Sequence, residues 1–503
     1  MSLDRRHFLG AAAAAVATTA LSRGARAQDY FVLGSDDITP DNIHYATLVD
    51  VAAKIRNREI SPVELTKIML ARIERINPAL NGYLTVTRDL ALQQARKAED
   101  EIMGGTYKGP LHGIPFSVKD LFYTKGIETT AGMALHRGFF PDYNATAVQR
   151  LEDAGGVLLG KLHMSEGAAL YPHPDFPTPV NPWRPDLWTG ASSSGSAIAT
   201  SAGMAFATLG TDTGGSIRAP AGAQGITGLK PTWGRVSRYG CFDFAPTFDH
   251  VGPMARSAAD AAAVLGVIAG WDPMDQTSLS TPVPPYLQDL LASDGLDGVS
   301  IGIDWDFIGA QPTDPLYDML PRAMDVLLSL GAEQRDITVP NVGGSYLGGY
   351  GPEIAMVHKD TYPAKKELYS DKFIPSIESG MKADPVAVAQ SRLNREKLIG
   401  ALDHMFRQVD ILVTPEFHGM QAPTWDEMVK GQTEDFHNFN KFTMIFDASQ
   451  SPAISLPCGF TEDGRPVNLQ FAARSGREDL LLRVAHEYQK VTDWHKCHPA
   501  AYA

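Results

Sequence analysis

The segment from residue 190 to residue 234 constrains the fold of this chain more than any other. It holds ten glycines in 45 residues, interleaved with serine, threonine and alanine. Its apolar residues are too regularly placed for a flexible linker. Glycine allows one stretch of backbone to approach another closely. We therefore expect tight turns here, inside a packed protein core.

The rest of the composition is that of a globular protein with one large core. The chain has 503 residues, of which 44% are hydrophobic and 20% are charged, and no Gly/Ser-rich or Pro-rich linker divides it. We predict one large domain over residues 28–503, with a core at about 110–260. A largely helical insertion is expected at about 260–410, where it could form the wall of a substrate cleft.

The charge of the chain excludes two classes of partner. The formal net charge is −14, and no run of lysine or arginine is present. Nucleic acids and anionic membranes bind basic patches. We therefore expect no nucleic-acid partner and no stable membrane association. The sequence does not define the oligomeric state.

The N-terminus has the pattern of a bacterial export signal. Arg5-Arg6 is followed by an Ala-rich apolar stretch to about Leu21 and by Ala25-Arg26-Ala27, a small-x-small cleavage site. The apolar stretch is too short to span a membrane. The paired arginines resemble a twin-arginine signal, although Asp4 stands where Ser or Thr is usual. An ordinary general-export signal is the alternative. Either reading predicts removal of residues 1–27 and a periplasmic or secreted protein.

The cysteines predict no disulfide framework and no metal centre. Cys241, Cys458 and Cys497 are widely spaced and odd in number. The tail His495-Lys496-Cys497-His498 brings soft ligands together, but a metal site needs more of them at a supporting spacing. We expect a frayed surface tail here. We predict neither a metal nor a cofactor.

Short apolar runs alternate with amphipathic stretches, which predicts buried strands joined by helices. Ser61-Pro62-Val63-Glu64 is a capping box that starts one helix, and Asn77-Pro78 is expected to end it. The other expected strands lie at 114–118, 156–160, 409–415, 452–457 and 467–471, and the other expected helices at 145–154, 316–330, 385–406 and 480–491.

Two serines are candidate nucleophiles. Ser300 lies in Gly298-Val299-Ser300-Ile301-Gly302, but this match to Gly-x-Ser-x-Gly opens a strand-like run and not a strand-to-helix turn. Ser216 follows Gly214-Gly215, and two glycines let the backbone aim successive N–H groups at one point, as an oxyanion hole requires. A tight turn with serine as a helix cap explains that stretch equally well.

The arrangement of these motifs resembles the amidase signature family. Gly190-Ala191-Ser192-Ser193-Ser194-Gly195-Ser196 is followed by Gly210-Thr-Asp-Thr-Gly-Gly-Ser-Ile-Arg-Ala-Pro220, and Ser192 and Ser216 are 24 residues apart, as in that family. His112 to Asp120 is similar to the family's lysine-bearing strand. The likeness continues at 228–232, 249–254 and 452–459. Ala191 and Ser194 depart from it, because the family usually has glycine at both positions.

The resemblance implies a fold and a reaction. The fold is an α/β domain with a mixed twisted sheet sandwiched between helices. The reaction is hydrolysis of the amide C–N bond of a small-molecule substrate through an acyl-enzyme. Ser216 is the implied nucleophile. Ser192, which is expected to follow a cis peptide bond, is the implied proton relay, and Lys119 is the implied base. A neutral lysine at pH 7 requires a pKa about 3 pH units below its ordinary value.

The resemblance also implies supporting roles around the nucleophile. The N–H groups of Thr213, Gly214, Gly215 and Ser216 would form the oxyanion hole. Asp212 and Arg218 are expected to form a structural ion pair.

The substrate cleft is expected to draw on residues 131–136, 164–179 and 340–450. Four aromatic residues near the motifs would suit an aromatic or apolar acyl group, or serve packing alone: Tyr171, Phe176, Trp183 and Trp188.

Three other functions fit the same motifs. Esters and carbamates pass through the same acyl-enzyme. The ammonia-generating component of a tRNA-dependent amidotransferase shares the signature, but it works in the cytosol with partner subunits, and the export signal favours the amidase. A non-catalytic binding protein is disfavoured by the intact Lys119, Ser192 and Ser216.

Overall fold

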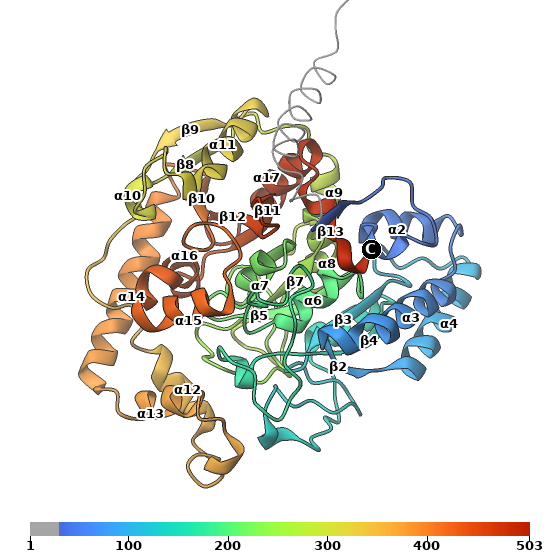
Figure 1. The fold of residues 1–503 in the computed structure, drawn as a ribbon, viewed down its shortest axis with the longest axis horizontal. Helices are drawn as coiled ribbons and strands as arrows, with labels where there is room; N and C mark the ends of the chain where they lie inside the picture. Colours follow the sequence, from blue (N-terminus) through green and yellow to red (C-terminus); the bar gives the residue numbers. More distant parts are fainter. Residues whose placement is uncertain (1–29) are drawn as a thin grey trace, which may run out of the picture.

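An eleven-stranded β-sheet runs through the centre of the molecule (Figure 1). The computed structural model describes residues 30–503, so the predicted export signal at 1–27 lies outside the described part. The strands of this sheet are β2 (Tyr83–Val86), β3 (Pro115–Lys119), β4 (Val157–Leu162), β5 (Ala207–Asp212), β6 (Thr227–Lys230), β7 (His250–Ala255), β8 (Ser300–Ile303), β9 (Glu333–Asp336), β10 (Ile411–Pro415), β11 (Ala453–Phe460) and β12 (Pro466–Ala473).

The sheet is mixed, and its strand order is β2-β4-β3-β5-β7-β6-β11-β12-β10-β8-β9. β3 pairs in parallel with both β4 and β5, and β8 pairs in parallel with β9 and β10. The central strands from β5 to β10 pair antiparallel. Parallel neighbours need crossover connections, and helices supply them on the β3 side of the sheet.

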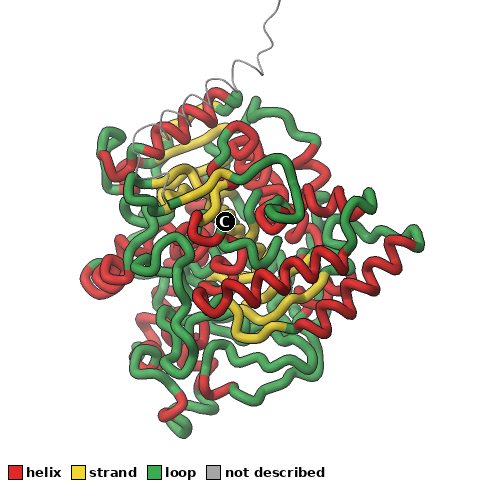
Figure 2. The backbone as a smooth tube through the Cα atoms, turned by 45° about the vertical axis from the view of Figure 1, so that its right-hand side comes forward, coloured by secondary structure: helices red, strands yellow, loops and turns green. Residues whose placement is uncertain are grey.

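Helices flank the strands (Figures 1 and 2). α8 and α17 pack against each other and against β7, β11 and β12, while α6 and α7 contact each other and β5, β6 and β11. The helices are α2 (Leu48–Arg56), α3 (Pro62–Leu80), α4 (Arg88–Met103), α5 (Thr146–Asp153), α6 (Ser194–Ser201), α7 (Arg218–Ala223), α8 (Ala258–Ile268), α9 (Tyr286–Leu291), α10 (Trp305–Ile308), α11 (Met319–Ser329), α12 (Tyr350–His358), α13 (Ile374–Met381), α14 (Pro385–Met405), α15 (Trp425–Glu434), α16 (Phe436–Ala448) and α17 (Glu478–Val491). This is the α/β domain that the resemblance implied.

The strands nearest the glycine-rich segment are buried along their whole length. Every residue of β3, β4 and β5 is buried. A strand that is covered on both faces reads as a continuous apolar run, which is why 114–118 and 156–160 predicted strands correctly. The polar side chains on these strands are therefore few, and they lie inside the protein.

The helix predicted from Ser61 begins as expected but ends later than expected. The Ser61 side chain accepts hydrogen bonds from the backbone N–H groups of Val63 and Glu64. The prediction that Asn77-Pro78 ends the helix was wrong, because α3 continues through Pro78 to Leu80. Leu80 is fully buried, so packing favours the additional turn.

The segment at 260–410 is mostly helical, but it is not a purely helical insertion. It contributes β8 and β9, which extend one edge of the main sheet. All four residues of β9 are exposed and polar, so this edge strand has no apolar alternation that the sequence could reveal. Its α12 and α13 pack against each other away from the sheet (Figure 1).

The C-terminal tail is not frayed, which corrects the prediction made for it. β13 (Cys497–Pro499) pairs antiparallel with β1 (Phe31–Leu33) in a separate two-stranded sheet. All three residues of β13 are buried. Pairing with the backbone of β1 holds the tail in place. The ring of Tyr45 also stacks on that of His498, with 3.7 Å between the ring centroids.

No helix in the part of the chain from residue 30 onward has the length and apolar character needed to cross a membrane.

Candidate active site

Lys119 lies at the end of β3 with its side chain fully buried. Its Nζ donates hydrogen bonds to Ser192 Oγ at 2.6 Å and to Thr211 Oγ1 at 2.8 Å. Burial lowers the pKa of Lys119 to about 7, although the carboxylates of Asp212 and Asp249 act in the opposite direction. At neutral pH a large fraction of this amine is therefore uncharged and able to accept a proton.

Asp120, the next residue, does not pair with Lys119. Its carboxylate forms an ion pair with Lys161 Nζ at 3.2 Å and accepts a hydrogen bond from the Thr130 N–H at 2.8 Å. Neighbouring side chains on a strand face opposite sides. Lys119 forms no ion pair within residues 30–503, and this leaves the effect of burial on its pKa largely uncompensated.

Ser192 lies in the turn that precedes α6, and its hydroxyl is buried. The Ala191–Ser192 peptide bond is cis, as the resemblance implied. Gly190 has φ of 77°, and a Cβ there would lie 2.1 Å from Pro220 Cα, so only glycine fits. Ala191 and Ser194, which replace glycines of the family pattern, are both buried, Ala191 in this turn and Ser194 as the first residue of α6.

The nucleophile candidate Ser216 lies on a loop that Asp212 holds in shape. Asp212 Oδ1 accepts a hydrogen bond from the Gly215 N–H at 2.6 Å, and Oδ2 accepts one from the Ile217 N–H at 3.1 Å. Gly215 has φ of 125°, and a Cβ there would meet Thr443 at 2.9 Å. One carboxylate thus fixes the backbone on both sides of Ser216.

Asp212 and Arg218 form a fully buried ion pair, with Arg218 Nε 2.9 Å from Asp212 Oδ2. Arg218 also pairs with Asp447 at 2.8 Å. Burial by itself raises the pKa of Asp212, but Arg218 outweighs it and holds that pKa below its ordinary value. Burial and the Asp212 charge raise the pKa of Asp447 well above its ordinary value.

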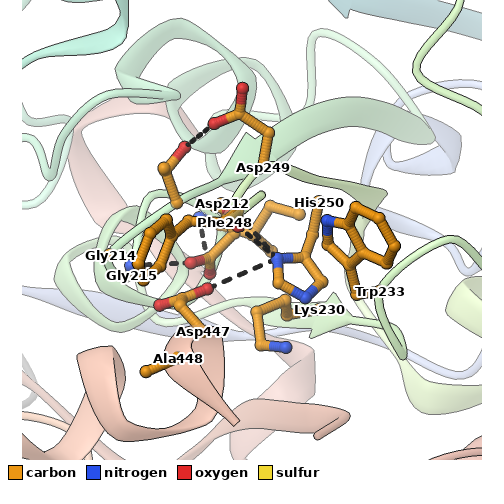
Figure 3. Close-up of polar contacts among 12 residues, drawn as sticks. Asp212, Gly214, Gly215, Lys230, Trp233, Phe248, Asp249, His250, Asp447 and Ala448 are labelled. Atoms are coloured by element: carbon orange, nitrogen blue, oxygen red, sulfur yellow. Dashed lines mark hydrogen bonds and ion pairs between the residues drawn. The ribbon is translucent and has the colours of Figure 1, made fainter. Parts of the chain in front are cut away.

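Figure 3 shows Asp212, Lys230, His250 and Asp447 close together beside Gly214 and Gly215. His250 Nδ1 donates to the Phe248 carbonyl oxygen at 2.6 Å and lies 3.5 Å from Asp447 Oδ1. Lys230 Nζ donates to the Ser451 carbonyl oxygen at 2.6 Å. Burial lowers the pKa of Lys230 to about 7, with Asp447 acting in the opposite direction. These groups support the loop from below and do not line the cavity beside Ser216.

Three backbone donors near Ser216 are unused in the described part of the chain. The N–H groups of Thr213, Gly214 and Ser216 donate to no acceptor within residues 30–503. The Gly215 N–H donates to Asp212 instead. An anion beside Ser216 would therefore meet free donors on either side of Gly215.

Ser216 opens into a cavity of about 400 Å³. Of the four aromatic residues predicted for the cleft, Tyr171 and Trp188 line this cavity, together with Phe244, Tyr350, Phe417 and Phe439. Parts of 164–179 and 340–450 form the walls, whereas 131–136 contributes nothing to them.

The other two predicted aromatic residues serve packing. Trp183 donates its Nε1–H to the Gln224 carbonyl oxygen at 2.8 Å, away from the cavity. The Arg137 guanidinium lies over the ring of Phe176, with its central carbon 4.6 Å from the ring centroid.

Several residues that shape the site were missed by sequence reasoning. Thr211 shares the Lys119 amine with Ser192. Thr443 Oγ1 donates to the Gly214 carbonyl oxygen at 2.8 Å, and Asp447 pairs with Arg218. Thr211 lies inside the glycine-rich motif and could have been found there. Thr443 and Asp447 lie outside every motif, and only the fold brings them to the loop.

Within residues 30–503, no group of three His, Cys, Asp or Glu side chains is placed to hold a metal ion.

Comparisons with known proteins identify the family. The chain matches the Amidase family over residues 64–482. AmiD of Mycobacterium tuberculosis is 41% identical over 473 residues, which cover 91% of this chain and 97% of AmiD. A glutamyl-tRNA(Gln) amidotransferase component of Methylococcus capsulatus is 37% identical, and the match covers 92% of this chain and 100% of that component. Peptide amidase from Stenotrophomonas maltophilia superposes with a TM-score of 0.75 at 29% identity, and the match covers 89% of this chain and 97% of the peptide amidase.

The fold, the site and these relatives together define a serine hydrolase that cleaves amides. The chain belongs to the amidase family, the family of the amidase signature, whose members act on small-molecule amides.

Proposed function

We propose that Lys119, Ser192 and Ser216 form a catalytic triad in which Ser216 attacks the amide carbonyl carbon. The observation that carries this proposal is the 2.6 Å contact between the buried Lys119 amine and Ser192 Oγ. Burial holds the pKa of Lys119 at about 7, which suits a general base at neutral pH.

The proton moves in two transfers. As the Ser216 oxygen bonds to the carbonyl carbon, its proton passes to Ser192, and the Ser192 proton passes to the Lys119 lone pair. When the C–N bond breaks, the same path returns a proton to the leaving nitrogen. Water then attacks the acyl-enzyme by the same route and releases the acid and free Ser216. Ser192 therefore acts as both acid and base.

The negative oxygen formed in each step needs hydrogen-bond donors. The unused N–H groups of Thr213, Gly214 and Ser216 are proposed to supply them. Gly215, the fourth donor that the resemblance implies, would have to share its N–H between Asp212 and this oxygen. Asp212 and Arg218 are proposed to hold the loop and to take no direct part.

The test is release of ammonia or amine from a panel of primary amides, anilides, carbamates and matched esters by the mature protein. The panel includes L-glutamine, because the amidotransferase component from Methylococcus capsulatus is 37% identical to this chain. Ser216→Ala should abolish hydrolysis. Ser300→Ala is the matched control, since Ser300 is a buried strand residue that hydrogen-bonds Asp410 at 2.7 Å, and it should retain full rate. Hydrolysis that survives in Ser216→Ala would overturn the nucleophile assignment.

We further propose that the protein is exported through the twin-arginine route. The basis is the Arg5-Arg6 pair and the apolar stretch behind it. Cell fractionation should find the wild-type protein outside the cytoplasm and the Arg5→Lys/Arg6→Lys variant inside it. Export of that variant would instead indicate the general pathway.

A further inference from the structure

One residue that lines the cavity beside Ser216 has a buried carboxyl oxygen without a hydrogen-bond partner among the described residues. Glu416 follows β10, lines the cavity and is 1% exposed. Ser455 donates its hydroxyl hydrogen to Glu416 Oε2. Glu416 Oε1 accepts and donates no hydrogen bond among the described residues. A buried polar atom of this kind is costly unless something satisfies it.

The protein makes room for this carboxyl group. Gly222 of α7 faces it, and a Cβ at that position would lie 2.5 Å from Oε2 and 2.9 Å from Oε1. On the other side, Asn468 Nδ2 donates to Ser455 Oγ at 3.2 Å, which directs the Ser455 hydrogen toward Glu416. Glu416 is thus fixed in orientation by three elements, with Oε1 left over.

A second unpartnered group lines the same cavity. Trp188 is 2% exposed, and its Nε1–H has no acceptor in the described part of the chain. Trp188 belongs to one apolar cluster with Ala219 and Phe417, and its ring centroid lies 6.2 Å from that of Phe417. Trp188 and Glu416 therefore line one cavity, whose walls combine aromatic and apolar side chains with polar ones such as Gln432 and Thr443.

The other ionisable groups of the cavity do not compete for this role. Glu166 is satisfied by the Ser370 N–H and hydroxyl groups. Lys372 is exposed, and its ammonium lies over the Tyr171 ring at 5.4 Å. Burial raises the pKa of Glu416 well above its ordinary value, although Ser455 and Arg218 act in the opposite direction. A neutral carboxyl group both donates and accepts hydrogen bonds.

We propose that Glu416 and Trp188 select the acyl group of the substrate, and that this group is apolar or aromatic and carries a neutral hydrogen-bonding substituent, a hydroxyl or an amide. An acceptor atom on that substituent receives the Trp188 N–H, and its hydrogen is donated to Glu416 Oε1. A site built to pair such a group rejects the analogue that lacks it. The proposal rests on the proposed function, because it places the acyl group in the cavity that Ser216 opens into.

The test measures binding to the Ser216→Ala protein, so its outcome does not depend on hydrolysis. The ligands are para-hydroxyphenylacetamide and phenylacetamide, which differ by one hydroxyl group. We expect the hydroxylated ligand to bind at least about tenfold more tightly, the factor that about 1.4 kcal/mol represents. Para-(aminomethyl)phenylacetamide, which is cationic, should bind no more tightly than phenylacetamide.

Variants assign the preference to the two side chains. In the same background, Glu416→Leu and Trp188→Phe should each bring the two affinities to within about threefold, because each variant weakens the hydroxylated ligand more than phenylacetamide. Glu416→Gln, which keeps a donor and an acceptor, should retain most of the preference for the hydroxylated ligand. If Glu416→Leu does not fold, Glu416→Gln and Trp188→Phe together test the proposal. The proposal is overturned by equal affinities in the parent, by tightest binding of the cationic ligand, or by a variant that weakens both ligands equally. Loss of hydrolysis chemistry in the amide panel, with the binding preference intact, would count against the proposed function alone.

Discussion

Thr443 donates its hydroxyl hydrogen to the carbonyl oxygen of Gly214 at 2.8 Å, so helix α16 holds the loop that carries Ser216. The carbonyl of Thr443 in turn accepts a hydrogen bond from Arg218 Nη1 at 3.1 Å. One residue of α16 therefore contacts the loop on both sides of the serine. This contact holds the Gly214–Gly215 peptide, which adjoins the unused Gly214 N–H.

Replacement of Thr443 tests this contact. Thr443→Val keeps the shape of the side chain and removes the hydroxyl, so we expect kcat to fall roughly tenfold, because small displacements of catalytic groups are costly. The free energy of unfolding should fall by only about 1 kcal/mol. Steady-state kinetics and urea denaturation measure the two effects. Thr443→Ser, which restores the hydroxyl, should recover most of kcat; a Val variant with normal kcat would contradict this role.

The proposed role of Lys119 as the base predicts a pH dependence of hydrolysis. Its pKa is lowered to about 7, and only the neutral amine accepts a proton. We therefore expect kcat/KM to rise with pH, with a midpoint near 7, and to fall tenfold per pH unit well below it. A profile measured from pH 5 to pH 9 with a neutral amide checks this.

Lys230 provides the control for that profile, because burial lowers its pKa to about 7 as well. Lys230 donates to backbone carbonyl oxygens and contacts neither serine. Lys230→Gln should therefore keep the midpoint near 7. If the rise of kcat/KM near pH 7 disappeared in this variant, Lys230 and not Lys119 would be the group that titrates.

The buried Asp212–Arg218 pair should dominate the stability of the loop that carries Ser216. Asp212→Asn removes one charge of a fully buried pair, so we expect the free energy of unfolding at pH 7 to fall by about 3 to 5 kcal/mol. Because the folded-state pKa of Asp212 lies below its unfolded value of about 3.9, its contribution is complete above that pH and is lost as the pH falls further. Urea denaturation at pH 7 and pH 3 should show the difference between wild type and variant shrinking at the lower pH; a constant difference would refute this account.

Glu166 ties the wall of the cavity to the core. Its carboxylate accepts hydrogen bonds from the N–H of Ser370, at 3.0 Å, and from the Ser370 hydroxyl. We expect Glu166→Ala to raise KM about fivefold, the factor that about 1 kcal/mol represents, because residues 370–376 lose their anchor. kcat should change little. Glu166→Gln, which can still accept from Ser370, should raise KM less, and an unchanged KM in Glu166→Ala would show that the anchor is dispensable.

Much of the fold could be predicted from the sequence because buried strands and amphipathic helices leave periodic patterns. The run at 411–413 is apolar, and the run at 453–456 is apolar except for Ser455, since β10 and β11 are covered on both faces. β9 could not be predicted, because its exposed polar residues owe their extended form to pairing with β8 alone. The tail was misread for a related reason: β1, a partner more than four hundred residues away, makes β13 a strand.

The site divides along the same line. Motifs with fixed spacing placed Lys119, Ser192 and Ser216 on the sequence, and the structure brings Lys119 and Ser192 into contact. Thr443, Asp447 and Glu416 have no spacing rule, since their positions depend on how the second part of the sheet meets the first. The sequence holds one weak indication of these residues, which is that the carboxylate of Glu416 directly follows an apolar stretch.

The join between β6 and β11 has a consequence for how the enzyme acquires activity. Residues 83–255 form all the strands on one side of this join, and residues 300–473 form all those on the other. The Ser216 loop belongs to the first set, whereas Thr443 and Asp447, which hold it, belong to the second. During refolding, hydrolysis should therefore appear only after the two sets of strands have joined. Neither set of strands is expected to hydrolyse an amide by itself.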